Sequence, residues 1–133
     1  MAFKWTDDLA TGNAIIDGEH QKLIKAADDL VEACSQGKGR QVIEDAVAFL
    51  VNYTKTHFAH EEELQQKSKF PAYQAHRAWH QGYIKKIEGV AADLKAQGAT
   101  IAIVAEVNAS ISELITHIKT MDVKIAQHIK SVQ

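Results

Sequence analysis

The sequence predicts an all-α protein, an antiparallel up-down-up-down four-helix bundle with an extended N-terminal arm. Apolar residues recur at helical spacing in four long segments, and no segment keeps the alternation with period two that marks a strand. Only one proline and seven glycines occur among 133 residues, so few positions can interrupt the helices. Four helices of this length with short connections favour a bundle in which neighbouring helices run antiparallel.

Residues 1–16 are expected to form the arm, with Phe3 and Trp5 folded onto the bundle. Residues 17–133 are expected to form the bundle itself. A chain of 133 residues can bury a hydrophobic core without disulfides, so residues 1–133 are predicted to be a single domain.

The first helix is predicted to start at Asp17, a residue type that caps helix N-termini, and to end in the run 35–39. The second helix is predicted over residues 40–66. The apolar stripe of the first helix is Leu23, Ile24, Ala27, Leu30, Val31 and Cys34, and that of the second includes Ile43, Ala46, Leu50, Tyr53 and Leu64.

The third helix is predicted to carry Pro71 in its first turn, where the missing N–H costs little. Gly98 and Thr100 mark the break before the fourth helix. The stripes of these two helices are Tyr73, Tyr83, Ile84, Ile87 and Leu94, and then Val104, Val107, Ile111, Leu114, Ile118, Met121 and Ile125.

Composition narrows the functional classes. The chain has 15 basic and 17 acidic residues, so nothing indicates a nucleic-acid partner. Cys34 is the only cysteine, which excludes an intrachain disulfide or a thiolate cluster and suits a reducing compartment. No signal peptide and no run of about 18 apolar residues is visible, so we expect a cytoplasmic protein without membrane insertion.

Five histidines and two carboxylates at helical spacings are the candidates for a metal site. A single histidine on an apolar stripe is usually a satisfied core or boundary residue. Seven such residues facing one core would be costly without a counter-charge, because an unpaired buried carboxylate costs several kcal/mol. The candidate ligands are His20, His57, Glu61, His76, His80, His117 and Asp122.

Their spacing places most of them on common faces. His57 and Glu61 are four residues apart, about 40° around a helix, and His76 and His80 repeat this relation. His117 and Asp122 are five apart, about 140° on a regular helix. That last pair should flank the site, unless a local π-bulge brings its members together.

One ion cannot use seven ligands, whereas two ions bridged by both carboxylates can. Nitrogen and carboxylate ligands without thiolate permit iron, manganese, zinc or cobalt, and ligand type alone does not decide among them. A zinc protease is disfavoured because the sequence contains no His-Glu-x-x-His string.

With these motifs the chain resembles the hemerythrins, in particular the single-domain bacterial hemerythrins. Trp5 also falls where that family keeps an N-terminal tryptophan. The matching strings run in order along nearly the whole chain: Ile16 to His20, His57 to Glu62, Phe70-Pro71 leading into His76 to His80, and His117 to Asp122.

The resemblance implies a cofactor of two unequal non-haem iron ions. One would be held by His76, His80 and His117, and the other by His20 and His57. Glu61 and Asp122 would bridge both ions together with an oxo or hydroxo group. The open position would lie on the iron with two histidines, where the family binds O2.

The implied function is reversible O2 binding, for carriage, storage or delivery to an O2-consuming enzyme, and not an enzymatic activity of the chain itself. Alternatives at the same centre are O2 or redox sensing, or an oxidase, peroxidase or nitric-oxide-handling activity. Ile118, from the family motif, and Leu114, from helix geometry, are expected to form the apolar wall of the O2 pocket. The resemblance also favours a monomer.

Several neighbouring residues are not expected to bind metal. His60 is the main competitor and is interpreted as a boundary histidine, while Glu62 and Glu63 are expected to be solvated. Trp79 is expected to serve packing or surface roles and not a redox relay. The sequence departs from the family at two non-ligand positions, with Glu19 in place of a frequent glutamine and Gln65 in place of a common methionine.

Overall fold

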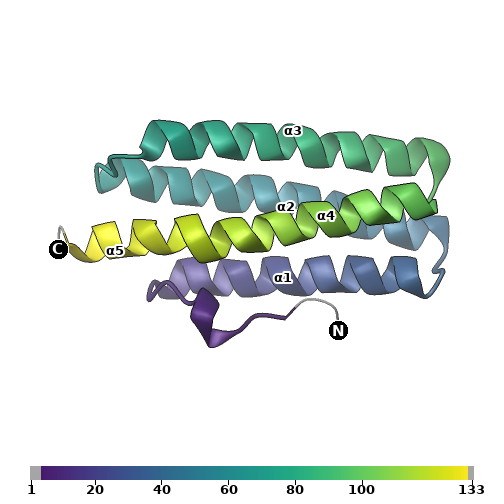
Figure 1. Cartoon of the computed structure of the whole chain (residues 1–133), viewed down its shortest axis with the longest axis horizontal. Coiled ribbons are helices and arrows are strands. Elements are labelled where there is room, and N and C mark those ends of the chain that lie inside the picture. The colour runs from purple at the N-terminus through teal and green to yellow at the C-terminus, as the bar shows by residue number, and fades with distance from the viewer. Residues whose placement is uncertain (1–3, 132–133) are drawn as a thin grey trace.

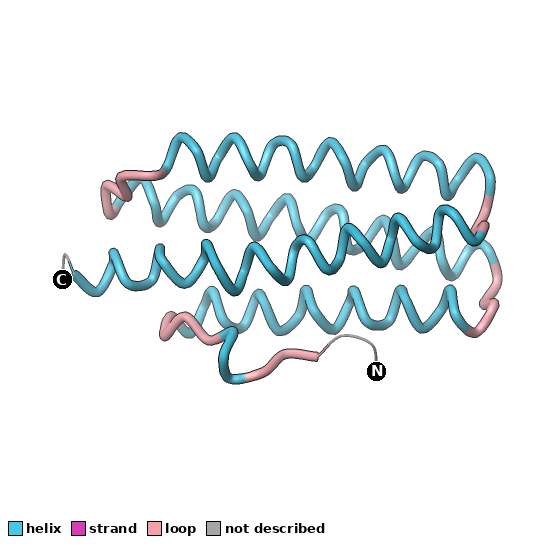
Figure 2. The backbone as a smooth tube through the Cα atoms, in the orientation of Figure 1, coloured by secondary structure: helices cyan, strands magenta, loops and turns pink. Residues whose placement is uncertain are grey.

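The computed structural model describes residues 4–131, so the expected packing of Phe3 lies outside the described residues. Four helical rods lie side by side and consecutive rods run antiparallel (Figures 1 and 2). This confirms the predicted all-α four-helix bundle, and no strand occurs among residues 4–131. The elements are η1 (Asp7–Leu9), α1 (Ala14–Ser35), α2 (Arg40–Lys67), α3 (Tyr73–Gln97), α4 (Ile101–His117), η2 (Ile118–Asp122) and α5 (Val123–Ser131).

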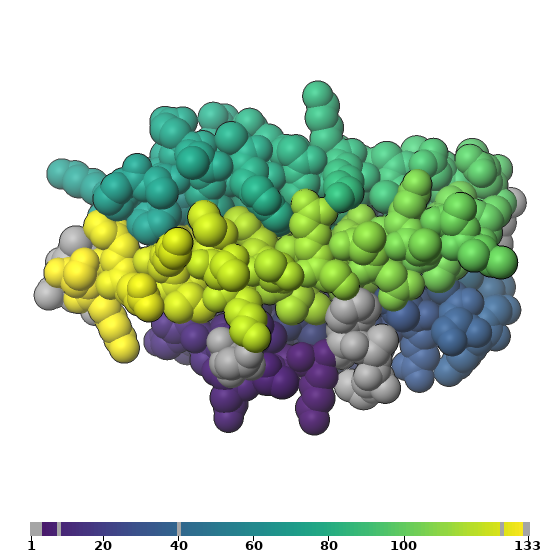
Figure 3. All heavy atoms as spheres, viewed as in Figure 1, coloured from purple at the N-terminus to yellow at the C-terminus, as the bar shows by residue number. Residues whose placement is uncertain are grey.

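The fourth rod is made of three elements that follow one another without a loop. It is α-helical in α4, π-helical in η2 and α-helical again in α5. Each rod packs against the next in sequence, and α4 also packs against α1, so the four rods enclose a common interior. The arm crosses the α1 side of the bundle, where η1 contacts η2 (Figure 3).

The start of α1 differs from the prediction. Asn13 is the N-cap, and its side chain accepts hydrogen bonds from the backbone N–H groups of Ile15 and Ile16 at 3.0 and 3.1 Å. Asp17 lies within the first turn and instead accepts from the backbone N and the Oγ1 of Thr11, at 2.8 and 2.7 Å. The predicted cap at Asp17 was therefore wrong, because this carboxylate holds the preceding loop.

The predicted start of the third helix was also wrong, whereas the predicted break between the third and fourth helices was correct. Pro71 lies in the turn that precedes α3, which begins only at Tyr73. Gly98 ends α3 with φ 80°, a conformation that favours glycine. Thr100 then caps α4, its hydroxyl accepting from the N–H of Ile103 at 3.2 Å.

A continuous apolar core fills the bundle and includes most of the predicted stripe residues of each rod; the exceptions are Leu64, Tyr73, Val104, Met121 and Ile125. Trp5 is half-buried against this core, as the sequence predicts. The rod Ile101–Ser131 is long and apolar enough to cross a membrane by length and composition alone, with a mean hydropathy of 1.3 in one window. Core helices of bundles pass the same test, so the expectation of no membrane insertion stays a prediction.

Candidate metal centre

The seven candidate ligands lie together in the interior of the bundle, each at most 4% exposed. All four rods contribute, because α1 carries one of them, α2 and α3 carry two each, and the fourth rod carries two. Their donor atoms form two groups that share Asp122, and within each group these atoms lie within 4.8 Å of one another. The first group is His76, His80, His117 and Asp122, and the second group is His20, His57, Glu61 and Asp122.

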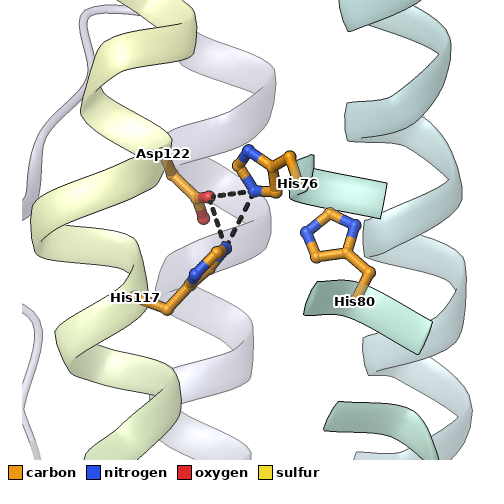
Figure 4. Close-up of side chains that lie close together, drawn as sticks. All are labelled: His76, His80, His117 and Asp122. Carbon is orange, nitrogen blue, oxygen red and sulfur yellow. Dashed lines mark hydrogen bonds and ion pairs between the residues drawn. The ribbon is translucent and has the colours of Figure 1, made fainter. Parts of the chain in front are cut away.

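The π-helical segment η2 explains how Asp122 reaches the centre. In a π-helix the backbone hydrogen bonds join residues five apart, so a residue and its fifth neighbour come onto the same side. His117 Nε2 consequently lies 3.1 Å from Asp122 Oδ1 (Figure 4). The sequence left two arrangements of this pair open, and the structure has the π-bulge.

Asp122 turns one oxygen toward each group. Its Oδ1 lies 3.1 Å from the Nε2 atoms of both His76 and His117, which are themselves 2.8 Å apart. Figure 4 shows this carboxylate and the two rings converging between the fourth rod and α3. Its Oδ2 lies 3.0 Å from Nε2 of His20 in the second group.

Glu61 also turns one oxygen toward each group. Its Oε1 lies 3.4 Å from Nε2 of His80, in the first group. Its Oε2 lies 3.5 Å from the Nε2 atoms of both His20 and His57, in the second group. Both carboxylates therefore have the orientation that two neighbouring cations with shared ligands require.

The donor atoms are arranged to bind metal ions rather than to form hydrogen bonds with one another. Both oxygens of Glu61 and Asp122, and the Nε2 atoms of His20, His57 and His80, are buried without a hydrogen bond of acceptable geometry among the described residues. Two donors each about 2.1 Å from one octahedral ion lie about 3.0 Å apart along a coordination edge. The observed separations of 2.8 to 3.5 Å match such edges.

In the absence of metal, neighbouring charges shift the pKa values of several of these side chains. Burial alone would raise the pKa of Asp122, but the nearby imidazoles of His117, His20 and His76 outweigh it and hold that pKa well below its usual range. Burial would likewise lower the pKa of His57, yet the charge of Glu61 and the contact with Glu19 raise it to about 10. The interior thus favours a positive charge beside its carboxylates, which is the charge a cation supplies.

Two carboxylates outside the groups orient ligand rings. Glu19 Oε1 lies 3.0 Å from Nδ1 of His57, and Glu62 Oε2 lies 3.1 Å from Nδ1 of His80. Such bonds fix which ring nitrogen is free to bind a metal. The expectation that Glu62 is solvated was therefore wrong, because its side chain is only 22% exposed and points back to α3.

Flat aromatic stacks hold two of the rings of the first group. Phe58 lies on His80 with ring centroids 3.7 Å apart and planes 4° apart. Trp79 lies on His117 at 3.6 Å and 7°. The packing role expected for Trp79 is confirmed, and Phe58 is a supporting residue that the sequence analysis did not identify, because any buried aromatic residue fits a core stripe.

Other residues near the centre are placed as follows. His60 is half exposed and its Nδ1 contacts Glu19 Oε2, so it belongs to neither group. Glu63 is exposed and pairs with Lys67, as expected. Gln65, one turn beyond Glu61, is fully buried and neither atom of its amide has a hydrogen-bond partner among the described residues.

The fold and the centre together define a helical-bundle cation-binding protein with a site rich in histidine and shared carboxylates. The sequence family described as the hemerythrin HHE cation binding domain matches residues 11–129. The chain therefore belongs to the hemerythrin family, as its motifs indicate.

Similarity to individual proteins agrees with this family assignment. A bacteriohemerythrin of Pseudomonas aeruginosa is 35% identical over 83 residues, which cover 62% of this chain and 54% of that relative. The chain thus spans about half the length of these bacterial relatives. A myohemerythrin of Riftia pachyptila is 30% identical over 122 residues, 92% of this chain and 89% of its own length.

Proposed function

We propose that this protein binds O2 reversibly at two iron ions, for carriage, storage or delivery to an O2-consuming enzyme. The observation that carries the proposal is that Glu61 and Asp122 each direct one oxygen to each of two buried histidine groups. When bound, a pair of irons supplies two electrons to one O2 molecule. Membership of the hemerythrin family, whose relatives are named bacteriohemerythrin and myohemerythrin, supports this function.

The two halves of the centre are unequal in protein donors, which supports the choice of the O2 position. The first group offers three imidazoles, whereas the second offers only His20 and His57. An ion in the second group would therefore have fewer protein ligands. We place the open position there, and we assign Glu61 and Asp122 as the ligands common to both ions.

An apolar surrounding is what keeps such binding reversible. Leu114 and Ile118 are 2% and 0% exposed and belong to the continuous core. Side chains of this kind hold no proton to donate and leave water no hydrogen-bonding partner, so charge separation near the ions is costly. We propose that these two residues wall the O2 pocket and that the chain carries O2 without turning over a substrate.

A cytoplasmic location, a monomeric state and an O2-consuming enzyme as recipient stay predictions. They need separate measurements on the purified protein and in cells.

A spectroscopic titration tests the function. The purified protein should hold two irons per chain by metal analysis. After anaerobic reduction, O2 should produce a visible absorption band that disappears on deoxygenation and returns through repeated cycles without product. Steady consumption of an added reductant would instead indicate an enzyme, and a single bound ion would contradict the proposed centre.

A further inference from the structure

A groove of about 550 Å³ lies on the surface between α3 and the fourth rod. His76 and His117 of the first group form part of its lining. Ala75 lines it from α3 and Ala109 from α4, with the carboxylate of Glu113 beside them. Figure 4 shows the two histidines reaching toward each other between these helices.

Other hollows of similar size do not lead to the centre. One of about 510 Å³ lies beside Trp5 and one of about 480 Å³ lies along residues 81–88, and neither is lined by any of the seven ligands. The rings of the second group line none of these hollows in the described part of the chain. Of these three hollows, the groove between α3 and α4 is the one whose lining includes ligand residues.

We propose that this groove is the port through which a hydrated divalent cation enters and leaves the centre. The inference rests on the proposed function, because it presumes that the two groups hold metal. A hexahydrated ion needs about 180 Å³, six waters at about 30 Å³ each, which the groove accommodates. An ion would then reach the fully buried second group by passing from the side of the first group.

Glu113 provides a first protein donor on this route. It precedes His117 by four residues, so the two side chains lie one turn apart on the same face of α4. Its side chain is 39% exposed, so an arriving ion can reach it, although one of its oxygens pairs with Lys86 at 2.5 Å. Each donor that joins the ion, first this carboxylate and then an imidazole, displaces one water molecule.

Filling the groove should slow metal exchange. Ala75→Trp would place a large side chain in the groove, while Ala78→Trp makes the same change at an exposed position of α3 outside its lining. The measurement is the rate of iron release from the anaerobically reduced, iron-loaded protein to bipyridine. The chelator is present at concentrations high enough that the release rate no longer depends on them. Release from Ala75→Trp should be about tenfold slower than from Ala78→Trp, an added barrier of about 1.4 kcal/mol.

A second pair of variants covers the case in which Ala75→Trp fails to fold. Ala109→Trp fills the groove from α4, and Ala102→Trp is its exposed control on the same helix. Glu113→Gln should slow iron uptake by the metal-depleted protein several-fold and leave the final iron content unchanged. Two irons per chain with equal release rates in plugged and control variants would overturn the port alone, whereas a chain that binds no iron would overturn the proposed function as well.

Discussion

Glu19 and His57 are joined across two helices by a contact of 3.0 Å between the carboxylate Oε1 and the ring Nδ1. The other oxygen of Glu19 contacts the exposed ring of His60. Burial alone would raise the pKa of Glu19, but these two histidines outweigh it and lower that pKa. A full negative charge therefore lies directly behind a ligand of the proposed O2-binding ion.

Glu19→Gln should slow oxidation of the loaded protein to the ferric form. The amide can still accept the bond from His57, but it removes the charge that favours the more highly charged ion. A bond to a charged acceptor exceeds one to a neutral acceptor by about 1 kcal/mol, so we expect about a fivefold effect. The measurement is the autoxidation rate in air, followed in the visible spectrum.

Glu63→Gln is the matched control for this charge effect. Glu63 is also an acidic residue near the centre in sequence, but it is exposed and paired with Lys67. Its replacement should leave the autoxidation rate unchanged. Equal rates in Glu19→Gln and the wild-type protein would show that the charge of Glu19 does not reach the ions.

Leu114→Ala should speed autoxidation, because it opens the apolar wall to water and protons. Leu94→Ala is the control, since both leucines are almost fully buried and Leu94 lies at the far end of α3. Both variants should lose about 2–5 kcal/mol of unfolding free energy. Only the change at Leu114 should alter the oxidation rate.

Ile118→Thr tests the same wall with a smaller, polar side chain that keeps the branch at Cβ. Ile118 is completely buried next to His117, so a hydroxyl there gives water a partner within the core. Autoxidation should become faster with two irons still bound. A rate equal to that of the wild-type protein in both wall variants would remove these residues from the O2 pocket.

His60→Ala should keep both irons, since the ring of His60 is half exposed and is directed to Glu19. His57→Ala should lower the iron content, because His57 is one of only two imidazoles in the second group. Metal analysis of the purified variants checks both statements. Loss of one iron from His60→Ala would mean that the wrong histidine of α2 has been assigned.

The features that could be predicted from the sequence are those that repeat with the periodicity of a helix. Pairs such as His57 and Glu61 follow the helical repeat, so the pattern of residues predicts the bundle and most of the candidate ligands, whereas His60 was set aside only because Glu61 matches the family motif. The cap at Asn13 could not be distinguished from Asp17, because both residue types cap helices. The role of Glu62 depends on the distance between α2 and α3, which no local pattern encodes.

Gln65→Met should stabilise the protein. Gln65 is 0% exposed and both polar atoms of its amide lack hydrogen-bond partners among the described residues. An unsatisfied buried polar group costs about 1–3 kcal/mol, and methionine has a similar volume without that cost. Thermal or denaturant unfolding of the metal-depleted protein should show this gain, and a loss of stability would indicate that the amide has a partner such as a buried water.

The π-bulge at η2 leads to a prediction about deletions. A π-bulge amounts to one extra residue in a helix, so deleting Thr120 should restore regular α-helical winding and leave α4 and α5 in phase. Asp122 would then follow His117 by four residues, which is again one turn away on the same face. The deletion of Thr120 should therefore retain two irons and the stability of the wild-type protein.

Deleting Ala105 from the regular part of α4 is the control, because it rotates the preceding residues by about 100° relative to the rest of the rod. This rotation takes Ile103 out of the core, and we expect a loss of several kcal/mol, or no folding. Circular dichroism melting and iron analysis of the two deletions give the comparison. If the Thr120 deletion were as damaging as the Ala105 deletion, η2 would not contain the extra residue that brings Asp122 to the centre.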